Sequence, residues 1–316
     1  MKKFISILLT IALVFSFAAC GEAPSDETFT VGICQLVQHE ALDAATEGFK
    51  AGMVSKLGDK VTFVEQNAAG DSANCSTICN QFVADKVDLI MANATPALLA
   101  ASAATADIPI VGTSISHYGT ALEIDDWTGK TGLNITGTSD LAPLDQQAAM
   151  VKELFPDVKK VGILYCSAEP NSVYQADVIA EELGKLGIAF EVFTFSDSND
   201  VASVTTTACS ACDVLYIPTD NTAATCSETI NNVAQPAGVP IVCGEAGLCK
   251  GCGVASLSIN YYDIGFTAGE MAAEILTEGT NPGDMEIKFA PKFEKMFNDP
   301  ICKALGVAVP EDYVAM

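Results

Sequence analysis

The sequence contains no arginine: its sixteen basic residues are all lysines, against forty aspartates and glutamates, and the formal net charge is −24. A surface this acidic repels the phosphates of nucleic acids and anionic lipid headgroups, so we expect no nucleic-acid partner. Without a guanidinium fork, a bound carboxylate would have to be held by backbone N–H groups, hydroxyls or a lysine.

Groups that commonly carry catalysis are also scarce. The chain has two histidines, His39 and His117, and aromatic residues make up 7% of it. It has no Gly-x-Ser-x-Gly elbow, no His-Glu-x-x-His pair and no glycine-rich phosphate loop. A cysteine-based hydrolase would need a thiolate beside one of the histidines, which no motif supports. We therefore expect a protein that is not an enzyme and that carries no cofactor.

No apolar run reaches the ~20 residues of a membrane-spanning helix. The longest, 4–17, follows Met1-Lys2-Lys3 and precedes Ala18-Ala19-Cys20, an order typical of a secretory signal peptide. A cysteine in this place resembles the lipobox of bacterial lipoproteins, although Phe17 stands where leucine is commoner. We expect a lipoprotein signal peptide over 1–20, with lipid on Cys20 as the first mature residue and a polar tether over 21–28. The alternative is a plain secretory signal.

Twelve cysteines, by contrast, are many for a chain of 316 residues. The pairs Cys209/Cys212 and Cys249/Cys252 could supply four thiolates to a zinc ion, but the spacing between the pairs is longer than in common zinc knuckles. Disulfides are a second alternative in an exported protein. The interpretation that we favour is small apolar filler in a protein from a low-oxygen setting, without a metal.

Short runs rich in β-branched residues alternate with helical patterns along the chain. Several runs are continuously apolar, which is typical of strands buried on both faces of a parallel sheet. The segments 40–57, 142–154 and 173–186 carry apolar residues at helical spacing. The expected strands are 30–36, 60–67, 88–93, 108–113 and 133–138 in one series, and 160–165, 190–195, 213–218, 240–244 and 254–259 in a second.

This alternation predicts an α/β protein of two Rossmann-like lobes, each a parallel sheet flanked by helices. We expect lobe 1 to comprise 29–139 plus about 261–286, and lobe 2 to comprise 140–260 plus about 287–316. The chain would then cross several times between the lobes, at a hinge that includes Ser139, Asn260 and Tyr261. Ligands of open α/β sheets bind outside the carboxyl ends of the strands, so the cleft between two such lobes is the expected site.

Many stretches resemble the substrate-binding proteins of ABC transporters, in particular those that bind aromatic and other small amino acids. The order and spacing of the stretches carry the resemblance over nearly the whole mature chain. It implies the type I periplasmic-binding-protein fold and an amino acid ligand. The stretches are 31–35 with His39, 88–90, 94–97, 134–140, 160–165, 169–172, 216–221, 261–265 and 305–310.

Hydroxyl and amide groups at two expected helix starts are the candidates for holding a ligand carboxylate. Thr95 precedes Pro96 and an alanine-rich helix expected over 97–106, and Asn171-Ser172 precedes the second-lobe helix from 173. Free N–H groups at a helix start favour anions, and side-chain hydroxyls there add donors. Plain helix capping is the structural alternative for all three residues.

Acidic residues at two second-lobe strand ends are the candidates for an ammonium group. Asp220-Asn221 follows the run 213–218, and the family resemblance implies that Asp220 neutralises the ligand amine. Glu245 ends the next strand and is a second candidate. Helix capping for Asp220 and simple solvation for Glu245 are the alternatives.

Two further residues complete the expected site. Gln35 lies at the end of the first strand and His39 at the start of the following helix, and we favour Gln35 as the ligand contact. Tyr118 lies in a loop where relatives often carry Asp-Pro, and its ring could form a stacking wall.

Together these observations predict a solute-binding lipoprotein, anchored outside the bacterial cell membrane, which captures a small amino acid with an aromatic or other apolar side chain. Its partners would be the permease and ATPase subunits of an ABC importer and the membrane, through the lipid anchor, and the protein itself is expected to be a monomer. A sugar or nucleoside receptor of the same fold, and a ligand sensor without transport, are the alternatives.

Overall fold

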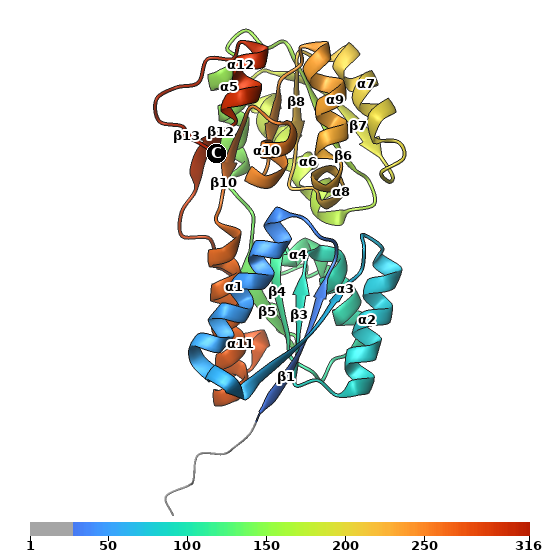
Figure 1. Ribbon diagram of the computed structural model, residues 1–316, viewed down its shortest axis with the longest axis vertical. Coiled ribbons are helices and arrows are strands. Elements are labelled where there is room, and N and C mark those ends of the chain that lie inside the picture. Colours follow the sequence, from blue (N-terminus) through green and yellow to red (C-terminus); the bar gives the residue numbers. More distant parts are fainter. Residues whose placement is uncertain (1–27) are drawn as a thin grey trace, which may run out of the picture.

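The computed structural model describes residues 28–316 and consists of two α/β lobes placed end to end along the long axis (Figure 1). The predicted signal peptide, the lipid on Cys20 and all but the last residue of the predicted tether lie outside the described residues. Among those residues, no helix combines the length and the apolar character needed to cross a membrane.

The lower lobe in Figure 1, which we call the first lobe, is built on a parallel sheet of strand order β11-β5-β4-β3-β1-β2. Helices α1 (Glu40–Leu57) and α11 (Tyr261–Glu278) bury one face of this sheet, and α2 (Ser72–Asp85) and α3 (Thr95–Ala104) bury the other. The short helix α4 (Tyr118–Ala121) follows β4. The strands are β1 (Phe29–Gln35), β2 (Val61–Asn67), β3 (Leu89–Asn93), β4 (Ile110–Ile115), β5 (Ile135–Ser139) and β11 (Lys288–Phe289).

The second lobe is built on a sheet of order β13-β12-β10-β9-β8-β6-β7, in which only the β10–β12 pairing is antiparallel. Its strands are β6 (Lys160–Cys166), β7 (Ala189–Phe195), β8 (Val214–Ile217), β9 (Ile241–Cys243), β10 (Ala255–Ser258), β12 (Glu294–Phe297) and β13 (Val314–Ala315). Its helices are α5 (Leu144–Leu154), α6 (Pro170–Lys185), α7 (Val201–Ala211), α8 (Asn221–Thr225), α9 (Ser227–Ala237), α10 (Ala246–Cys252) and α12 (Asp299–Leu305).

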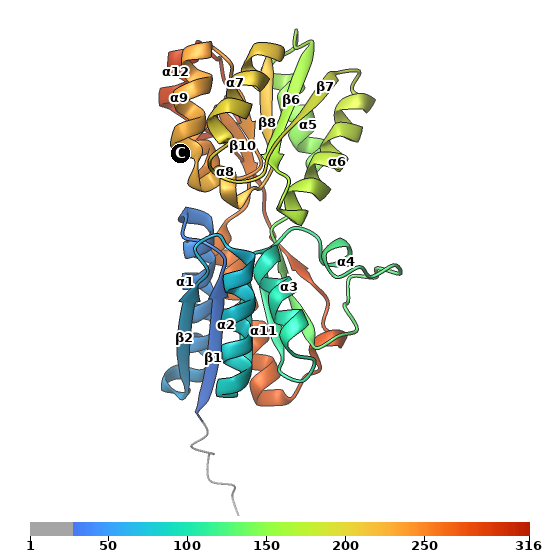
Figure 2. The same cartoon turned by 90° about the vertical axis from the view of Figure 1, so that its right-hand side faces the viewer.

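Three segments carry the chain between the lobes: from β5 to α5, from β10 to α11, and from β11 to β12 (Figures 1 and 2). The expected two-lobed α/β fold is therefore confirmed, and all ten expected strands are present within two residues of their expected ends. The expected boundary near 286 remains a proposal; residues 288 and 289 pair with β5 in the first sheet. The helix expected over 97–106 instead begins at Thr95, because proline is well placed in a first helical turn.

Helices α1 and α11 pack unusually closely. Four glycines make this contact possible: a Cβ added at any of them would lie 2.1–2.2 Å from a backbone oxygen of the facing helix. They lie four residues apart on each helix, at Gly48 and Gly52 and at Gly265 and Gly269. This contact fixes the start of α1, which faces the second lobe.

The eleven cysteines after Cys20 are all free thiols, and nine of them are buried. In each lobe one strand cysteine lies close to two helix cysteines: Cys34 to Cys75 and Cys79, and Cys243 to Cys249 and Cys252. Within residues 28–316, no group of three or more histidine, cysteine or acidic side chains is placed to hold a metal ion.

Candidate functional site

The carboxyl ends of the parallel strands in each lobe point toward the other lobe (Figure 2). Side chains from the two lobes are in contact there. The contacts include hydrogen bonds, an exposed ion pair and a stacked pair of rings with centroids 4.7 Å apart. They join His39 to Asn221, Ser116 to Gln175, Glu40 to Lys250 and His117 to Tyr174.

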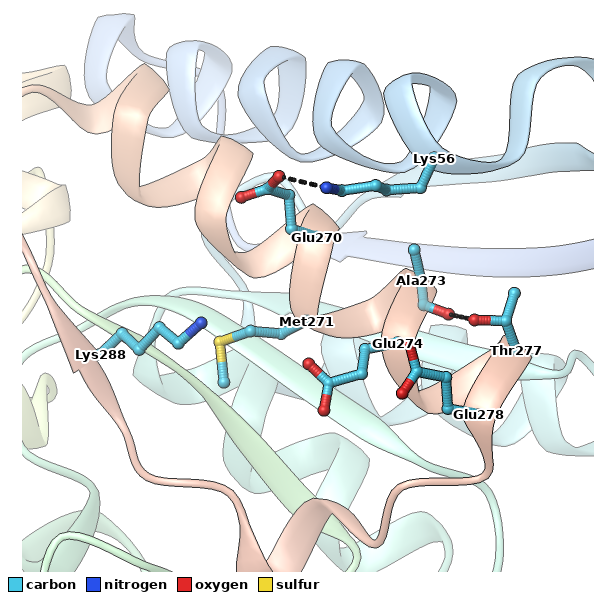
Figure 3. A pocket seen from close by; sticks show the side chains of 8 residues that line it. All are labelled: Lys56, Glu270, Met271, Ala273, Glu274, Thr277, Glu278 and Lys288. Atoms are coloured by element: carbon cyan, nitrogen blue, oxygen red, sulfur yellow. Dashed lines mark hydrogen bonds and ion pairs between the residues drawn. The ribbon is translucent and has the colours of Figure 1, made fainter.

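Of the larger cavities, one lies away from these strand ends. It has about 290 Å³ and is lined by α1, α11 and β11 on the first lobe alone (Figure 3). Lys56 pairs with Glu270 at 2.9 Å on its wall. Because no second-lobe residue lines it, this cavity does not match a ligand site between lobes.

Two of the larger cavities are lined by both lobes. One has about 270 Å³ and lies between Leu36, Val37 and Pro96 of the first lobe and the loop at Glu169 of the second. The other has about 700 Å³ and lies beside the hinge, between α1, α10 and residues 290–294. A volume of several hundred Å³ suits a small-molecule ligand.

Glu169 is the centre of a polar cluster on the second lobe, and sequence reasoning gave it no role. It is 5% exposed, and its carboxylate accepts hydrogen bonds from five donors. These are the backbone and side-chain N–H groups of Asn221, the backbone N–H and hydroxyl of Thr222, and the side chain of Asn171. The signal that could have found it is its place at the end of β6, opposite Asp220.

Asp220 lies beside this cluster and caps α8. Its carboxylate accepts the backbone N–H groups of Cys166 and Ala223, both at 2.7 Å. Burial, and secondly the charge of Glu169, raise the pKa of Asp220 to about 7. Asp220 therefore caps a helix, as its structural alternative predicts. Among residues 28–316, no lysine forms an ion pair with its buried carboxylate.

Asn171 and Thr95 face each other from the two lobes. Both line a narrow cavity of about 10 Å³, and both are buried. The Nδ2 of Asn171 donates to the Thr219 carbonyl at 2.9 Å, whereas its Oδ1 is buried without a hydrogen-bond partner. The structure thus brings together the two predicted helix starts, although the space between them would have to widen to admit a carboxylate.

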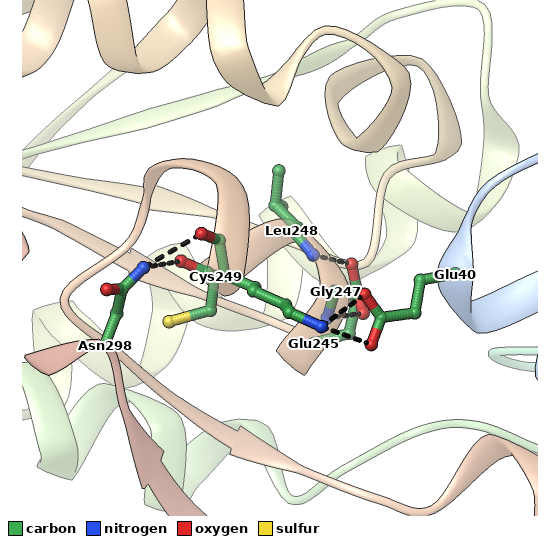
Figure 4. Close-up of polar contacts among 7 residues, drawn as sticks. Glu40, Glu245, Gly247, Leu248, Cys249 and Asn298 are labelled. Carbon is green, nitrogen blue, oxygen red and sulfur yellow. Dashed lines mark hydrogen bonds and ion pairs between the residues drawn. The ribbon is translucent and has the colours of Figure 1, made fainter. Parts of the chain in front are cut away.

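Glu245 caps α10 by accepting the backbone N–H groups of Gly247 and Leu248 (Figure 4). Its side chain lines the larger interlobe cavity, where Glu40 of α1 also lies. Burial raises the pKa of Glu245, and the nearby His39 acts in the opposite direction. Solvation, the alternative for Glu245, does not describe a residue that is 3% exposed.

Two predicted contacts are placed elsewhere, and we remove them from the site. The Gln35 amide bonds to Val37 and Asp43 and accepts from Thr46, all within the first lobe. Tyr118 lies in the first-lobe core and donates to the Thr138 carbonyl, because its ring fills the space that Gly112 and Gly137 leave. His39, which we had set second to Gln35, is the residue that reaches the second lobe.

The sequence matches the family model of the ABC transporter substrate binding proteins over residues 30–316. The chain belongs to this family. It is 35% identical over 280 residues to the tyrosine-binding protein of Clostridioides difficile (strain R20291), covering 88% of this chain and 81% of that protein. Family members bind substrates outside the cytoplasm and are not enzymes as a class.

Solved structures of substrate-binding proteins agree with this assignment. A complex with L-Trp from Streptococcus pneumoniae is 31% identical with a TM-score of 0.86, covering 90% of this chain and 97% of that one. The ligand-free, open structure of a substrate binding protein with adhesive properties from Clostridium difficile is 33% identical with a TM-score of 0.69, covering 92% and 99%. The type I periplasmic-binding-protein fold is thereby confirmed. The TM-score is higher against the L-Trp complex than against the ligand-free, open structure.

The predicted hinge residues of this substrate-binding protein lie at the crossings between lobes. Ser139 ends β5 and donates to the Ser116 carbonyl, while Asn260 caps α11. The Tyr261 hydroxyl donates to Asp140 at 3.1 Å. Sequence reasoning missed Asp140, whose burial raises its pKa to about 6.

Proposed function

We propose that the protein captures a zwitterionic amino acid between its lobes and delivers it to the permease of an ABC importer. The observation that carries this proposal is a set of four carboxylates, each at most 5% exposed, at the interlobe site. No ion pair between a lysine and one of them is found in the part of the chain that the structure describes. They are Asp140, Glu169, Asp220 and Glu245.

Buried negative charge without a counter-charge is costly, and the raised pKa values of Asp140, Asp220 and Glu245 reflect that cost. The ammonium group of an amino acid would supply the missing positive charge. Asp220 remains our choice for its direct partner, because the family resemblance implies this role and its neighbour Asn221 lines the cavity of about 270 Å³.

The carboxylate of the ligand needs hydrogen-bond donors, and no lysine among residues 28–316 lines the cavity of about 270 Å³ to supply them. We assign the ligand carboxylate to the start of α3 at Thr95 and the start of α6 at Asn171 and Ser172. Free N–H groups and the helix dipole favour an anion at both places. The unpartnered amide oxygen of Asn171 indicates that this side chain can turn to present its N–H₂ group instead.

Tyrosine and tryptophan are the first ligands to test, because they are the ligands named for the two relatives above. The apolar side chains of Leu36, Val37 and Pro96 line the cavity of about 270 Å³ and would face an aromatic ring. This ring pocket is part of the proposal.

Titration calorimetry with matched compounds tests both ends of the ligand. Tyrosine carries both charged groups, tyramine lacks the carboxylate and N-acetyltyrosine lacks the ammonium group. We expect tyrosine or tryptophan to bind, and each truncated compound to bind at least about tenfold more weakly, since a charge-assisted contact contributes ~1.5–3 kcal/mol. Binding of N-acetyltyrosine as tightly as tyrosine would contradict the ammonium assignment. Binding of sugars or nucleosides in place of amino acids would overturn the proposal.

Site variants assign the roles to residues. We expect Asp220→Asn to weaken the binding of tyrosine and to leave the binding of N-acetyltyrosine unchanged, because that compound has no ammonium group. We expect Thr95→Val to weaken the binding of tyrosine and to leave the binding of tyramine unchanged, because that compound has no carboxylate. Tyr118→Phe is the matched control, because it removes one hydroxyl from the first-lobe core and none from the site.

The lipid anchor and the role in import are proposals as well. Incorporation of labelled palmitate into the chain, lost in Cys20→Ala, would support the anchor. Uptake of labelled tyrosine that depends on this chain and on a permease would support import over sensing. Normal uptake after deletion of the gene would contradict it.

A further inference from the structure

One part-buried hydrogen bond joins the two lobes at the start of α1. His39, at the cap position of α1, meets Asn221, the first residue of α8, with Nε2 and Oδ1 3.1 Å apart. Opening the lobes must break this bond, since its two residues belong to different sheets and different lobes. Asn221 lines the cavity of about 270 Å³ and follows Asp220, which is assigned above to the ligand.

The direction of this bond is set by Glu169. The Nδ2 of Asn221 donates to the Glu169 carboxylate at 2.7 Å, and its backbone N–H donates to the same oxygen at 3.0 Å. A carboxylate cannot donate, so the amide of Asn221 must turn its nitrogen to Glu169 and its oxygen to His39. His39 is therefore the donor through Nε2–H, which neutral imidazole provides in only one tautomer.

Glu169 itself cannot readily turn away. Thr222 holds its second oxygen through a backbone N–H at 2.8 Å and a hydroxyl at 2.7 Å. All five donors to Glu169 come from the second lobe, so this half of the contact is assembled before the lobes meet. Pre-assembly lowers the entropy lost when the lobes close.

We propose that Glu169 is a positioning residue, which presents the Asn221 carbonyl to His39, and that the His39–Asn221 bond is a latch that holds the lobes closed over the ligand. The inference rests on the proposed function, because it concerns how long the ligand is retained. A ligand leaves only from the open state, so a bond present only in the closed state slows release. Capture occurs from the open state, where the latch is not yet made, and its rate is therefore little affected.

Stopped-flow binding of tyrosine to the full chain in detergent measures the two rates separately. We expect His39→Ala to speed dissociation about three- to tenfold, the effect of one lost hydrogen bond, and to change association less than about twofold. His39→Gln keeps an N–H donor for Asn221 and should restore slow release. Glu169→Gln should also speed release, because it replaces one accepting carboxylate oxygen with an amide nitrogen, which would face the N–H and O–H donors of the cluster and could not accept from them.

Tyr313→Phe is the matched control for loss of a hydrogen bond in the second lobe. Tyr313 donates to Glu153 at 2.9 Å, within the same lobe, so its loss should lower the melting temperature without changing ligand release. If Glu169→Gln unfolds the loop that Glu169 organises, His39→Ala, which is on the other lobe, decides the outcome. Unchanged dissociation in His39→Ala, or no rescue by His39→Gln, would overturn the latch.

Small-angle scattering of the ligand-free chain keeps this inference separate from the proposed function. We expect His39→Ala and Glu169→Gln to shift the ligand-free protein toward a larger radius of gyration, with Tyr313→Phe and His39→Gln unchanged. If no amino acid binds the natural chain, the proposed function fails, yet this shift would still support the latch. If tyrosine binds and neither scattering nor release responds to the variants, the latch alone fails.

Discussion

The acidic residues of the interlobe site serve two purposes at once. Asp220 and Glu245 cap short helices, and their capping bonds fix the directions in which the carboxylates point. The same burial that makes these caps rigid raises the pKa of both side chains. A cap and a ligand partner are therefore compatible roles for one carboxylate.

The raised pKa of Asp220 predicts how stability changes with pH. Between the unfolded pKa near 4 and the folded pKa of about 7, the native state holds a proton that the unfolded state has released. The free energy of unfolding of the ligand-free protein should thus fall as pH rises from 5 to 8, by roughly 1–4 kcal/mol through this residue. Urea unfolding at four pH values measures it.

Asp220→Asn provides the control for this pH dependence. Many surface carboxylates also titrate in a chain of net charge −24, and they remain in the variant. We expect the difference in unfolding free energy between natural chain and variant to change with pH in the stated direction. A difference that stays constant from pH 5 to 8 would contradict the raised pKa.

Sequence reasoning at this scale located strand ends better than side-chain directions. Asn171, Ser172, Asp220 and Asn221 could be placed together, because each follows a recognisable apolar strand. Whether Gln35 or His39 faces the second lobe depends on packing that no local pattern encodes. The position of Tyr118 could not be predicted for a related reason. Its ring occupies space left by Gly112 of β4 and Gly137 of β5, which no pattern around Tyr118 indicates.

At the scale of elements, the long strands and helices followed from their periodicity, whereas β11, β12 and β13 did not. These strands have two to four residues, too few for an alternation to be recognised. Their pairing partners, such as β5 for β11, are far away in the sequence. The α1–α11 contact was missed as well, since its glycines become meaningful only when the two helices face each other.

Gly52→Ala tests this helix contact. The added Cβ would lie 2.2 Å from the Phe266 carbonyl oxygen, so the backbones must separate. We expect a loss of about 1–3 kcal/mol in unfolding free energy, measured by urea denaturation. Because His39 caps α1, a shift of this helix should weaken the His39–Asn221 bond, and tyrosine should dissociate faster.

Gly184→Ala is the matched control in an exposed helix. Nothing lies within 4 Å of a Cβ added there, so this change should stabilise the protein by up to about 1 kcal/mol. An equal effect of both substitutions would show that helix propensity, and not close packing, governs Gly52.

At the scale of the whole molecule, the two lobes have separate cores. Apolar clusters on the two faces of each sheet are built from residues of that lobe. The lobes meet through polar and aromatic contacts and through one small apolar cluster at the hinge, which joins Ala41 of α1 to Ile259 and Ala290. Units with separate cores can unfold independently when little couples them. A ligand that contacts both lobes adds such coupling, because it binds only while both are folded.

Differential scanning calorimetry measures that coupling. For the ligand-free chain we expect a transition whose calorimetric enthalpy exceeds the van't Hoff enthalpy, the sign that two units melt separately. At a tyrosine concentration 100-fold above Kd, binding stabilises the folded state by about 2.7 kcal/mol, and the two enthalpies should converge as the lobes melt together. His39→Ala should widen the ligand-free transition further, because it removes a bond between the lobes. A single two-state transition in the absence of ligand would show that the three chain crossings already couple the lobes, leaving the ligand to raise the melting temperature without changing the cooperativity.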